Sequence, residues 1–262
     1  MNSFINNLAI YTKGEEKNLP VIFVHGFPFD HTMWDAQTAA LYKNYYCITY
    51  DIRGLGKSAA GDGQYTIETF VDDLNSIIDH CKLKKPALCG LSMGGYISLR
   101  AIERMQEKFR ALILCDTKSV SDSDETKLKR AKAIQRINEG QFEGFINEFV
   151  ANCFYEEFIS EKRKEFETIL NRSKKNNPIG VKGCLLAMAA RTDTSSTLNK
   201  ISIPCLIVCG SEDKISPPDV MMAIADKIKS SEFVLAEGAG HMTPIEKPKI
   251  VTEAIRSFLK RI

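Results

Sequence analysis

The segment Gly90-Leu91-Ser92-Met93-Gly94 fits the pattern G-x-S-x-G, which can carry a nucleophilic serine. It lies between a short apolar run at 87–89, predicted as a strand, and a helix predicted to begin near Met93. A tight strand-to-helix turn crowds the positions two before and two after the serine, and glycine at both positions relieves that crowding. The hydroxyl would then stand at a helix N-terminus, whose dipole favours developing negative charge. We therefore interpret Ser92 as a nucleophile rather than as part of an ordinary glycine-rich turn.

A serine nucleophile needs a general base, and His241 is the candidate. With a serine on such a turn, the acid and then the histidine follow the serine along the chain. The chain has four histidines, and His241 alone lies downstream of Ser92. A carboxylate must orient the imidazole, and Asp213 follows the predicted strand 205–209 in a loop long enough to fold back toward the histidine. Asp116, which follows an earlier predicted strand, is the alternative acid. The length and turn residues of its loop favour Asp213.

The oxyanion that forms during acyl transfer needs backbone N–H donors. The residue after the nucleophile, Met93, supplies one of them. The second is expected from the loop His25-Gly26-Phe27-Pro28, which follows the predicted strand 21–24. Proline has no N–H, so Pro28 cannot donate and Phe27 is the best-placed donor. His25 is expected to hold this loop in shape rather than to transfer protons.

Short apolar runs rich in β-branched residues alternate with helical patterns along most of the chain. Continuously apolar strands separated by helices indicate a mostly parallel sheet covered by helices on both faces, which is the α/β class. Ligands of such sheets bind in the crevice outside the carboxyl ends of the strands. The predicted strands span residues 21–24, 46–50, 87–89, 111–115, 205–209 and 233–235, and helices are predicted from about residues 66, 93 and 248.

The alternation stops between residues 118 and 198, where helical patterns occur and no strand is predicted. Phenylalanines recur there at three- and four-residue spacing, beginning with Phe142 and Phe145, and form an apolar stripe. We expect a helical cap insertion at 118–198 that covers the carboxyl edge of the sheet. The core would then consist of residues 1–117 and 199–262.

Composition and charge narrow the classes of function. The formal net charge is +2, so nothing indicates a nucleic-acid or membrane partner, and a small molecule is the expected partner. The first twenty residues lack the pattern of a secretory signal. The eight cysteines lie mostly in apolar runs, as buried thiols of a reducing compartment do, which predicts a cytoplasmic location. No cluster has metal-ligand spacing and residues 90–95 do not fit G-x-G-x-x-G, so neither a metal nor a dinucleotide cofactor is expected.

Four motifs in this order resemble the α/β-hydrolase superfamily: residues 25–28, 90–95, 210–213 and 240–242. The segment 51–58 also matches a loop that is common in that superfamily. Within it, the chain is similar to small serine esterases, to cofactor-free haloperoxidase or perhydrolase-like enzymes, and to enol-lactonases. The resemblance implies an α/β-hydrolase fold with a Ser-His-Asp triad. Asp51 and Arg53 are expected to brace the structure rather than to take part in catalysis.

The mechanism implied is acyl transfer, in which Ser92 attacks the carbonyl of a carboxylic ester or lactone and water then releases the acid from an acyl-enzyme. Bulky apolar side chains near the predicted catalytic loops favour small to medium uncharged acyl substrates. The same triad would also serve an enol-lactonase, a C–C hydrolase or a perhydrolase, and a ligand sensor with slow turnover is a further alternative. The expected substrate-binding residues are Phe29, Trp34, Phe142, Phe145 and Met242.

Overall fold

One sheet organises the chain, and its parallel strands lie side by side. The computed structural model describes residues 2–262, in which eight strands form a sheet of order β1-β2-β4-β3-β5-β6-β7-β8. Strands β3 to β8 pair in parallel, whereas β1 and β2 form antiparallel pairs at one edge. The strands are β1 (Asn2–Ile5), β2 (Leu8–Lys13), β3 (Leu19–Val24), β4 (Tyr45–Tyr50), β5 (Ala87–Leu91), β6 (Ala111–Cys115), β7 (Cys205–Gly210) and β8 (Ser231–Ala236).

The central strands are buried along their whole length, which explains their continuously apolar sequences. Every residue of β4, β5, β6 and β7 is buried. Such strands need helices on both faces, so the predicted α/β class is confirmed. The hairpin β1–β2 is absent from the strands predicted from the sequence. Its two-residue turn, Asn6-Asn7, has φ values of 50° and 65°, a conformation that asparagine tolerates and that favours a tight hairpin.

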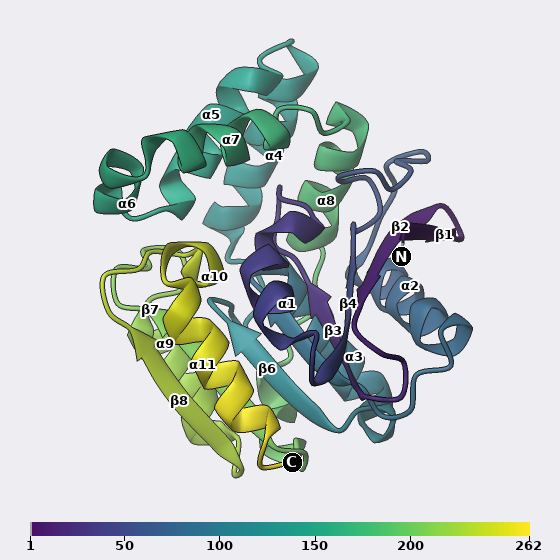
Figure 1. Cartoon of the computed structure of the whole chain (residues 1–262). Coiled ribbons are helices and arrows are strands. Elements are labelled where there is room, and N and C mark those ends of the chain that lie inside the picture. Colours follow the sequence, from purple (N-terminus) through teal and green to yellow (C-terminus); the bar gives the residue numbers. More distant parts are fainter. Residues whose placement is uncertain (1) are drawn as a thin grey trace.

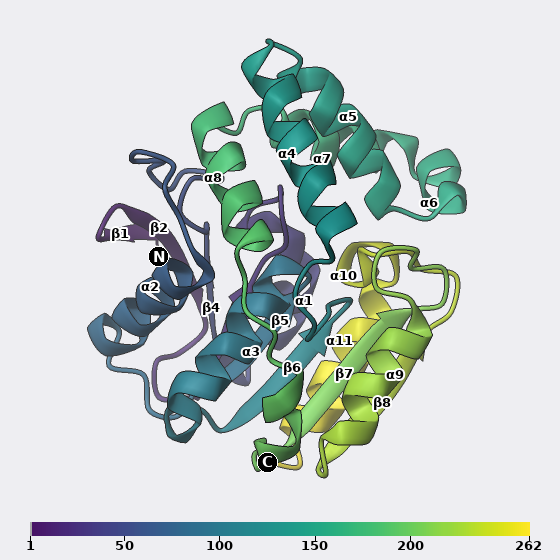
Figure 2. The same ribbon diagram turned by 180° about the vertical axis from the view of Figure 1, so that it is seen from behind.

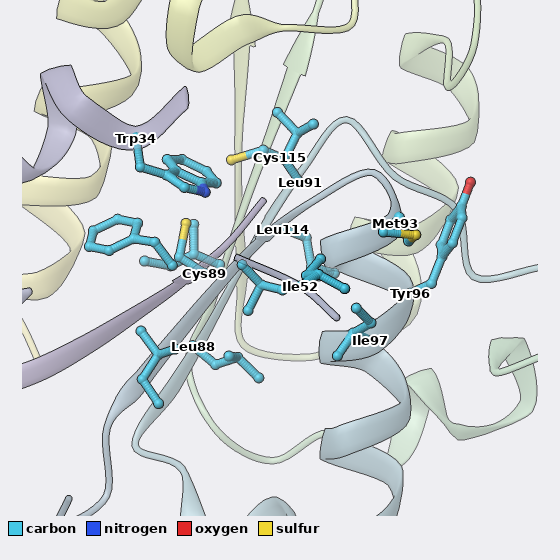
Figure 3. Close-up of a cluster of buried hydrophobic side chains, with 14 of the residues drawn as sticks. Trp34, Ile52, Leu88, Cys89, Leu91, Met93, Tyr96, Ile97, Leu114 and Cys115 are labelled. Carbon is cyan, nitrogen blue, oxygen red and sulfur yellow. The ribbon is translucent and has the colours of Figure 1, made fainter. Parts of the chain in front are cut away.

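Helices cover both faces of the sheet. Helices α1 (Asp35–Leu41) and α11 (Pro248–Leu259) pack on one face, seen in front in Figure 1. Helices α2 (Ile67–His80), α3 (Met93–Met105) and α9 (Pro218–Lys227) cover the opposite face, seen in front in Figure 2. Figure 3 shows the resulting core, with Trp34 on one side of the central strands and Ile97 of α3 on the other.

The long connection between β6 and β7 is helical, as the sequence predicted. Its helices are α4 (Asp124–Asn138), α5 (Phe142–Cys153), α6 (Glu156–Glu161), α7 (Arg163–Ser173) and α8 (Pro178–Ala189). They gather above the edge of the sheet at which the parallel strands end (Figures 1 and 2). We call these helices the α4–α8 layer. Within residues 2–262, no helix is both long enough and apolar enough to cross a membrane.

Asp122 joins the two ends of the α4–α8 layer. Its carboxylate pairs with Arg130 in α4 and with Arg191, which follows α8. The side chains of Asp122 and Arg191 are each 4% exposed. Arg191 also donates to the carbonyl oxygens of Met188 and Val120 at 3.1 and 2.8 Å. One buried carboxylate therefore compensates two cations at the point where the layer leaves the sheet and returns to it.

Removing this carboxylate should destabilise the protein strongly. Asp122→Ala leaves two arginines without their partner in a buried site, and we expect the free energy of unfolding to fall by about 3–5 kcal/mol. Asp124→Ala is the matched control, because the Asp124 side chain is 97% exposed and its loss should cost at most about 1 kcal/mol. Denaturant titrations followed by circular dichroism measure both changes. Equal stabilities of the two variants would contradict this role of Asp122.

Candidate active site

Ser92 occupies a strained turn between β5 and α3. Its backbone has φ 54° and ψ −115°, in the left-handed region that residues with side chains rarely adopt. The two flanking glycines are required by close packing. A Cβ atom at Gly90 would collide with the carbonyl oxygen of Gly94, and one at Gly94 would collide with the carbonyl oxygen of Val24. The crowding predicted from the G-x-S-x-G pattern is therefore present in the structure.

His241 and Asp213 meet where the loops after β8 and β7 come together. The imidazole Nδ1 of His241 lies 2.8 Å from Oδ2 of Asp213, and both side chains are almost fully buried. The same carboxylate accepts hydrogen bonds from the backbone N–H groups of Ile215 and Ser216 at 2.7 and 3.0 Å. The Ser216 hydroxyl donates to Oδ2 at 2.6 Å and lies 3.2 Å from His241 Nδ1. The carboxylate is thus fixed in the position that orients the imidazole.

The charge of Asp213 is maintained by its neighbours. Burial alone would raise the pKa of this carboxyl, but the charge of a protonated His241 and the hydrogen bonds from His241 and Ser216 lower it to about 2. Asp213 is therefore ionised at neutral pH, and its negative charge would stabilise a positive charge on the imidazole. Ser216 was not among the residues singled out from the sequence, because a serine three positions after an acid carries no distinctive pattern.

Asp116, the alternative acid, has a different environment. It accepts hydrogen bonds from the backbone N–H of Gly210 at 2.9 Å and from the hydroxyl of Thr243. Burial, and secondly the charge of Asp213, raise the pKa of Asp116 well above its usual range. Asp116 therefore braces the loops that carry Asp213 and His241, whereas Asp213 alone of the two carboxyls bonds to the imidazole.

Asp116, Cys209 and Asp213 also form a cluster of residue types that bind metals. One potential ligand atom from each lies within 4.8 Å of the others, and all three residues are buried. Their hydrogen bonds already account for this proximity, since Cys209 Sγ bonds to the carbonyl oxygens of Gly210 and Ser216 at 3.3 and 3.5 Å. The cluster is explained by the packing of the loops after β6 and β7.

The loop that carries His241 is tied to the α4–α8 layer. The backbone N–H of His241 donates to the carbonyl oxygen of Cys153, at the end of α5, at 3.0 Å. The carboxylate of Glu246 accepts from the N–H groups of Tyr155, Gly240 and Met242 at 2.8, 3.1 and 2.9 Å. Residues 153–155 and 240–242 are therefore held together on both sides of the histidine. Glu246 could not be identified from the sequence, because its role depends on a contact between segments that are distant along the chain.

Ser92 and His241 line one cavity of about 720 Å³, which lies beneath helices α4, α5 and α8. The Ser92 hydroxyl forms no hydrogen bond with any other residue in the range 2–262 and lines this cavity. The large apolar and aromatic side chains of the wall are Phe27, Tyr96, Phe145, Phe149, Leu185 and Met188. An organic molecule with a hydrocarbon part would find complementary surface here.

The predicted oxyanion donors flank Ser92. Phe27 lines the same cavity, and among residues 2–262 its backbone N–H has no hydrogen-bond acceptor. Met93 is the first residue of α3, so its N–H has no preceding helical carbonyl to bond to. Both N–H groups are available to an acceptor. Pro28, which follows Phe27 through a cis peptide bond, has no N–H to offer.

The structure changes the set of residues expected to contact the substrate. Of the predicted residues, only Phe145 lines the cavity that contains Ser92. Trp34 and Met242 are fully buried in the core, and Phe29 lines a separate cavity of about 360 Å³. Phe142, at the start of α5, packs against the core. These four side chains therefore lie outside the wall of the cavity that contains Ser92, because proximity in sequence to a catalytic loop does not determine the direction in which a side chain points.

Sequence periodicity located the helices but not their cavity-facing sides. Phe149 lies in the same apolar stripe as Phe145 and reaches the cavity, but Tyr96, Leu185 and Met188 were not predicted. Both faces of α8 are rich in apolar residues, so no stripe marks the side that faces the cavity.

His25, Asp51 and Arg53 have structural partners. Nδ1 of His25 lies 2.9 Å from the carbonyl oxygen of Gly26, and its Nε2 accepts from the N–H of Ile52 at 2.8 Å. His25 therefore holds its loop in shape, as predicted. Asp51 accepts from the ring and backbone of His31, and Arg53 pairs with Asp73. Asp51 and Arg53 thus brace separate loops rather than each other.

The fold and this arrangement of loops define a class of hydrolases. A family model described as the α/β hydrolase fold matches residues 20–248, and the chain belongs to this family. It is 26% identical over 250 residues to 3-oxoadipate enol-lactonase 2 of Acinetobacter baylyi, covering 95% of this chain and 92% of that protein. It is 27% identical over 272 residues to a putative non-heme chloroperoxidase of Synechocystis, covering 97% and 95%.

Solved structures agree with this assignment. A thermophilic esterase from Thermogutta terrifontis, solved with malate bound, superposes with a TM-score of 0.93 at 36% identity, covering 97% of this chain and 93% of that one. The enol-lactonase and the esterase are hydrolytic enzymes, and this chain is an α/β hydrolase enzyme.

The two buried acids should differ sharply in their effect on activity. Asp213→Asn keeps the size of the side chain but leaves the imidazole in the wrong tautomer, and kcat on a simple ester should fall by about 10⁴. Asp116→Asn retains hydrogen-bonding capacity toward Gly210 and Thr243, and kcat should fall by less than about tenfold. Steady-state kinetics of both purified variants measures this. A larger loss in Asp116→Asn would assign the orienting role to the earlier strand.

Proposed function

We propose that the protein is a serine hydrolase that cleaves carboxylic esters or lactones of small to medium size through Ser92, His241 and Asp213. One observation carries this proposal: His241, which is hydrogen-bonded to Asp213, lines the same cavity as Ser92 on its strained turn. The α/β hydrolase family and the esterase and enol-lactonase relatives support the same class of reaction.

The proposed reaction proceeds through an acyl-enzyme. His241 accepts the proton of the Ser92 hydroxyl, and Oγ attacks the substrate carbonyl carbon. The tetrahedral intermediate collapses, the C–O bond to the alcohol breaks, and His241 returns the proton to the departing oxygen. A water molecule, deprotonated by His241, then attacks the acyl carbon and releases the acid and Ser92. With a lactone, the departing alcohol stays attached to the acyl group, so the single product carries both the carboxylic acid and the hydroxyl group.

The proposed oxyanion site rests on the backbone around Ser92. The N–H groups of Phe27 and Met93 are free to donate to the negative oxygen of the tetrahedral intermediate. Met93 begins α3, a helix of thirteen residues, so the N-terminal end of the helix dipole adds to this stabilisation. Backbone donors fixed by the fold need no rearrangement when the charge develops.

The extent of the cavity supports a compact substrate beneath a cap. We propose that residues 118–198 act as this cap over a core of 1–117 and 199–262, because the wall of the cavity includes side chains from α4, α5 and α8. A cavity of about 720 Å³ suits a small-molecule ester or lactone. We also propose a cytoplasmic location, supported by eight cysteines that all remain free thiols in the structure. The same residues would also serve an enol-lactonase, a C–C hydrolase or a perhydrolase.

Covalent labelling tests the nucleophile. A serine-directed phosphonate should modify Ser92 alone, because Ser92 is the one serine of the described residues that lines the cavity together with His241. Peptide mass spectrometry locates the adduct. Ser92→Ala should abolish labelling and lower kcat by at least about 10⁴. Inactivation of the enzyme with the adduct on another residue would contradict the assignment.

A series of acyl chain lengths tests the proposed size of the substrate. With p-nitrophenyl esters from acetate to palmitate, kcat/KM should be highest for short or medium chains, because side chains of α4, α5 and α8 form part of the cavity wall and limit the space. Rates that rise to the longest chain, with activation at an oil–water interface, would instead identify a lipase and rule out a compact acyl site.

A further inference from the structure

Lys118 is a cationic residue beside the proposed nucleophile for which the mechanism above has no use. It lies three residues after β6 and lines the same cavity as Ser92 and His241. Its side chain is half-buried, and it forms no hydrogen bond or ion pair with any residue of the described chain, 2–262. Taking an ammonium group partly out of water without a partner is unfavourable. An unpaired lysine at this position therefore indicates a missing negative group.

The other cations of the cavity wall do not share this property. Lys132 is unpaired but exposed, so water solvates its charge. Each remaining cation has a carboxylate partner: Lys129 with Glu125, Arg130 with Asp122, Arg136 with Glu148, and Lys214 with Glu156. Lys118 is therefore the one lysine or arginine of the wall, among the described residues, that is both partly buried and unpaired.

Two cations and two carboxylates act on Lys118: Arg191 and Arg130 share the carboxylate of Asp122, and the charge of Asp213 also reaches the lysine. Asp213 is already bonded to His241 and Ser216, so Lys118 itself is the positive charge in excess. Arg191 stacks over the ring of Tyr96, with 4.0 Å from guanidinium carbon to ring centroid, and its Nε is buried without a partner. Burial and, secondly, the charge of Arg191 lower the pKa of Lys118 from its usual range. A bound anion would offset both effects.

We propose that Lys118 binds a carboxylate group of the substrate, so that the preferred substrates are small esters or lactones that also carry one free carboxylate. This proposal rests on the proposed function and specifies its substrate class. It departs from the uncharged substrates predicted from the sequence, since that prediction considered the apolar side chains of the site and not Lys118. The hydrocarbon part of such a substrate would contact apolar residues such as Phe145 and Leu185.

A carboxylate matches the site better than a more highly charged anion. One ammonium group balances one negative charge, and Lys118 contributes a single ammonium. The two terminal nitrogens of Arg191, Nη1 and Nη2, are already bonded to Asp122, Met188 and Val120. The positively charged residues around the cavity would also raise the local concentration of an anionic substrate and its rate of association.

Matched pairs of substrates test the proposal. Monomethyl glutarate is compared with methyl pentanoate, which places the charge on the acyl side, and 4-acetoxybutanoate is compared with butyl acetate, which places it on the alcohol side. For at least one pair, kcat/KM of the wild-type enzyme should be at least about tenfold higher for the acid. In Lys118→Met this ratio of acid to neutral ester should fall at least about tenfold, and Lys118→Arg should retain part of it.

Lys127→Met is the matched control, because Lys127 is exposed on α4 and does not line the cavity. It should keep the wild-type ratio. Turnover of both esters with a ratio near one in the wild type, or with an unchanged ratio in Lys118→Met, overturns the proposal and leaves the proposed function intact. If Lys118→Met does not fold, the ratio of kcat/KM for the acid to that for the neutral ester is measured in Lys118→Gln instead. An unchanged ratio in Lys118→Gln likewise overturns the proposal. Failure to hydrolyse any of the four esters, together with no phosphonate labelling of Ser92, would instead contradict the proposed function.

Discussion

The strained backbone at Ser92 is the constraint on which the site depends. A residue with a side chain keeps φ near 54° only when its surroundings hold it there. Here the strand before Ser92, β5, is buried along its whole length, and α3 begins at Met93, directly after Ser92. Gly94 packs against the carbonyl oxygen of Val24 at the end of β3. That contact places the loop containing Phe27 beside the hydroxyl. One turn therefore positions the serine, the Met93 N–H and the Phe27 N–H together.

The imidazole is positioned from two directions. Asp213 fixes Nδ1 from the loop after β7, while the backbone of His241 is tied to the end of α5 through the Cys153 carbonyl. Glu246 reinforces this junction through three backbone N–H groups, although burial raises the pKa of its carboxyl. The α4–α8 layer thus both encloses the cavity and supports the histidine loop. Changes in this layer would therefore affect the chemistry as well as the choice of substrate.

The sequence predicted the features that depend on local patterns. Continuously apolar strands indicated the parallel sheet, and the glycines around Ser92 indicated a crowded turn that the structure contains. Ser92, Asp213 and His241 are brought to one edge because strand ends in a parallel sheet share that edge. The lining of the cavity could not be predicted in the same way. Trp34 points into the core rather than toward the cavity, and the unpaired state of Lys118 becomes visible only when its three-dimensional neighbours are known.

The most direct test of the proposed catalytic residues is a crystal structure of the enzyme inhibited by a phosphonate. We expect a bond from phosphorus to Ser92 Oγ, with one phosphoryl oxygen within hydrogen-bond distance of the N–H groups of both Phe27 and Met93. His241 should face the leaving-group position while Nδ1 remains bonded to Asp213. An adduct on Ser92 whose phosphoryl oxygen points away from both N–H groups would contradict the proposed oxyanion site, and an adduct on another residue would contradict the account as a whole.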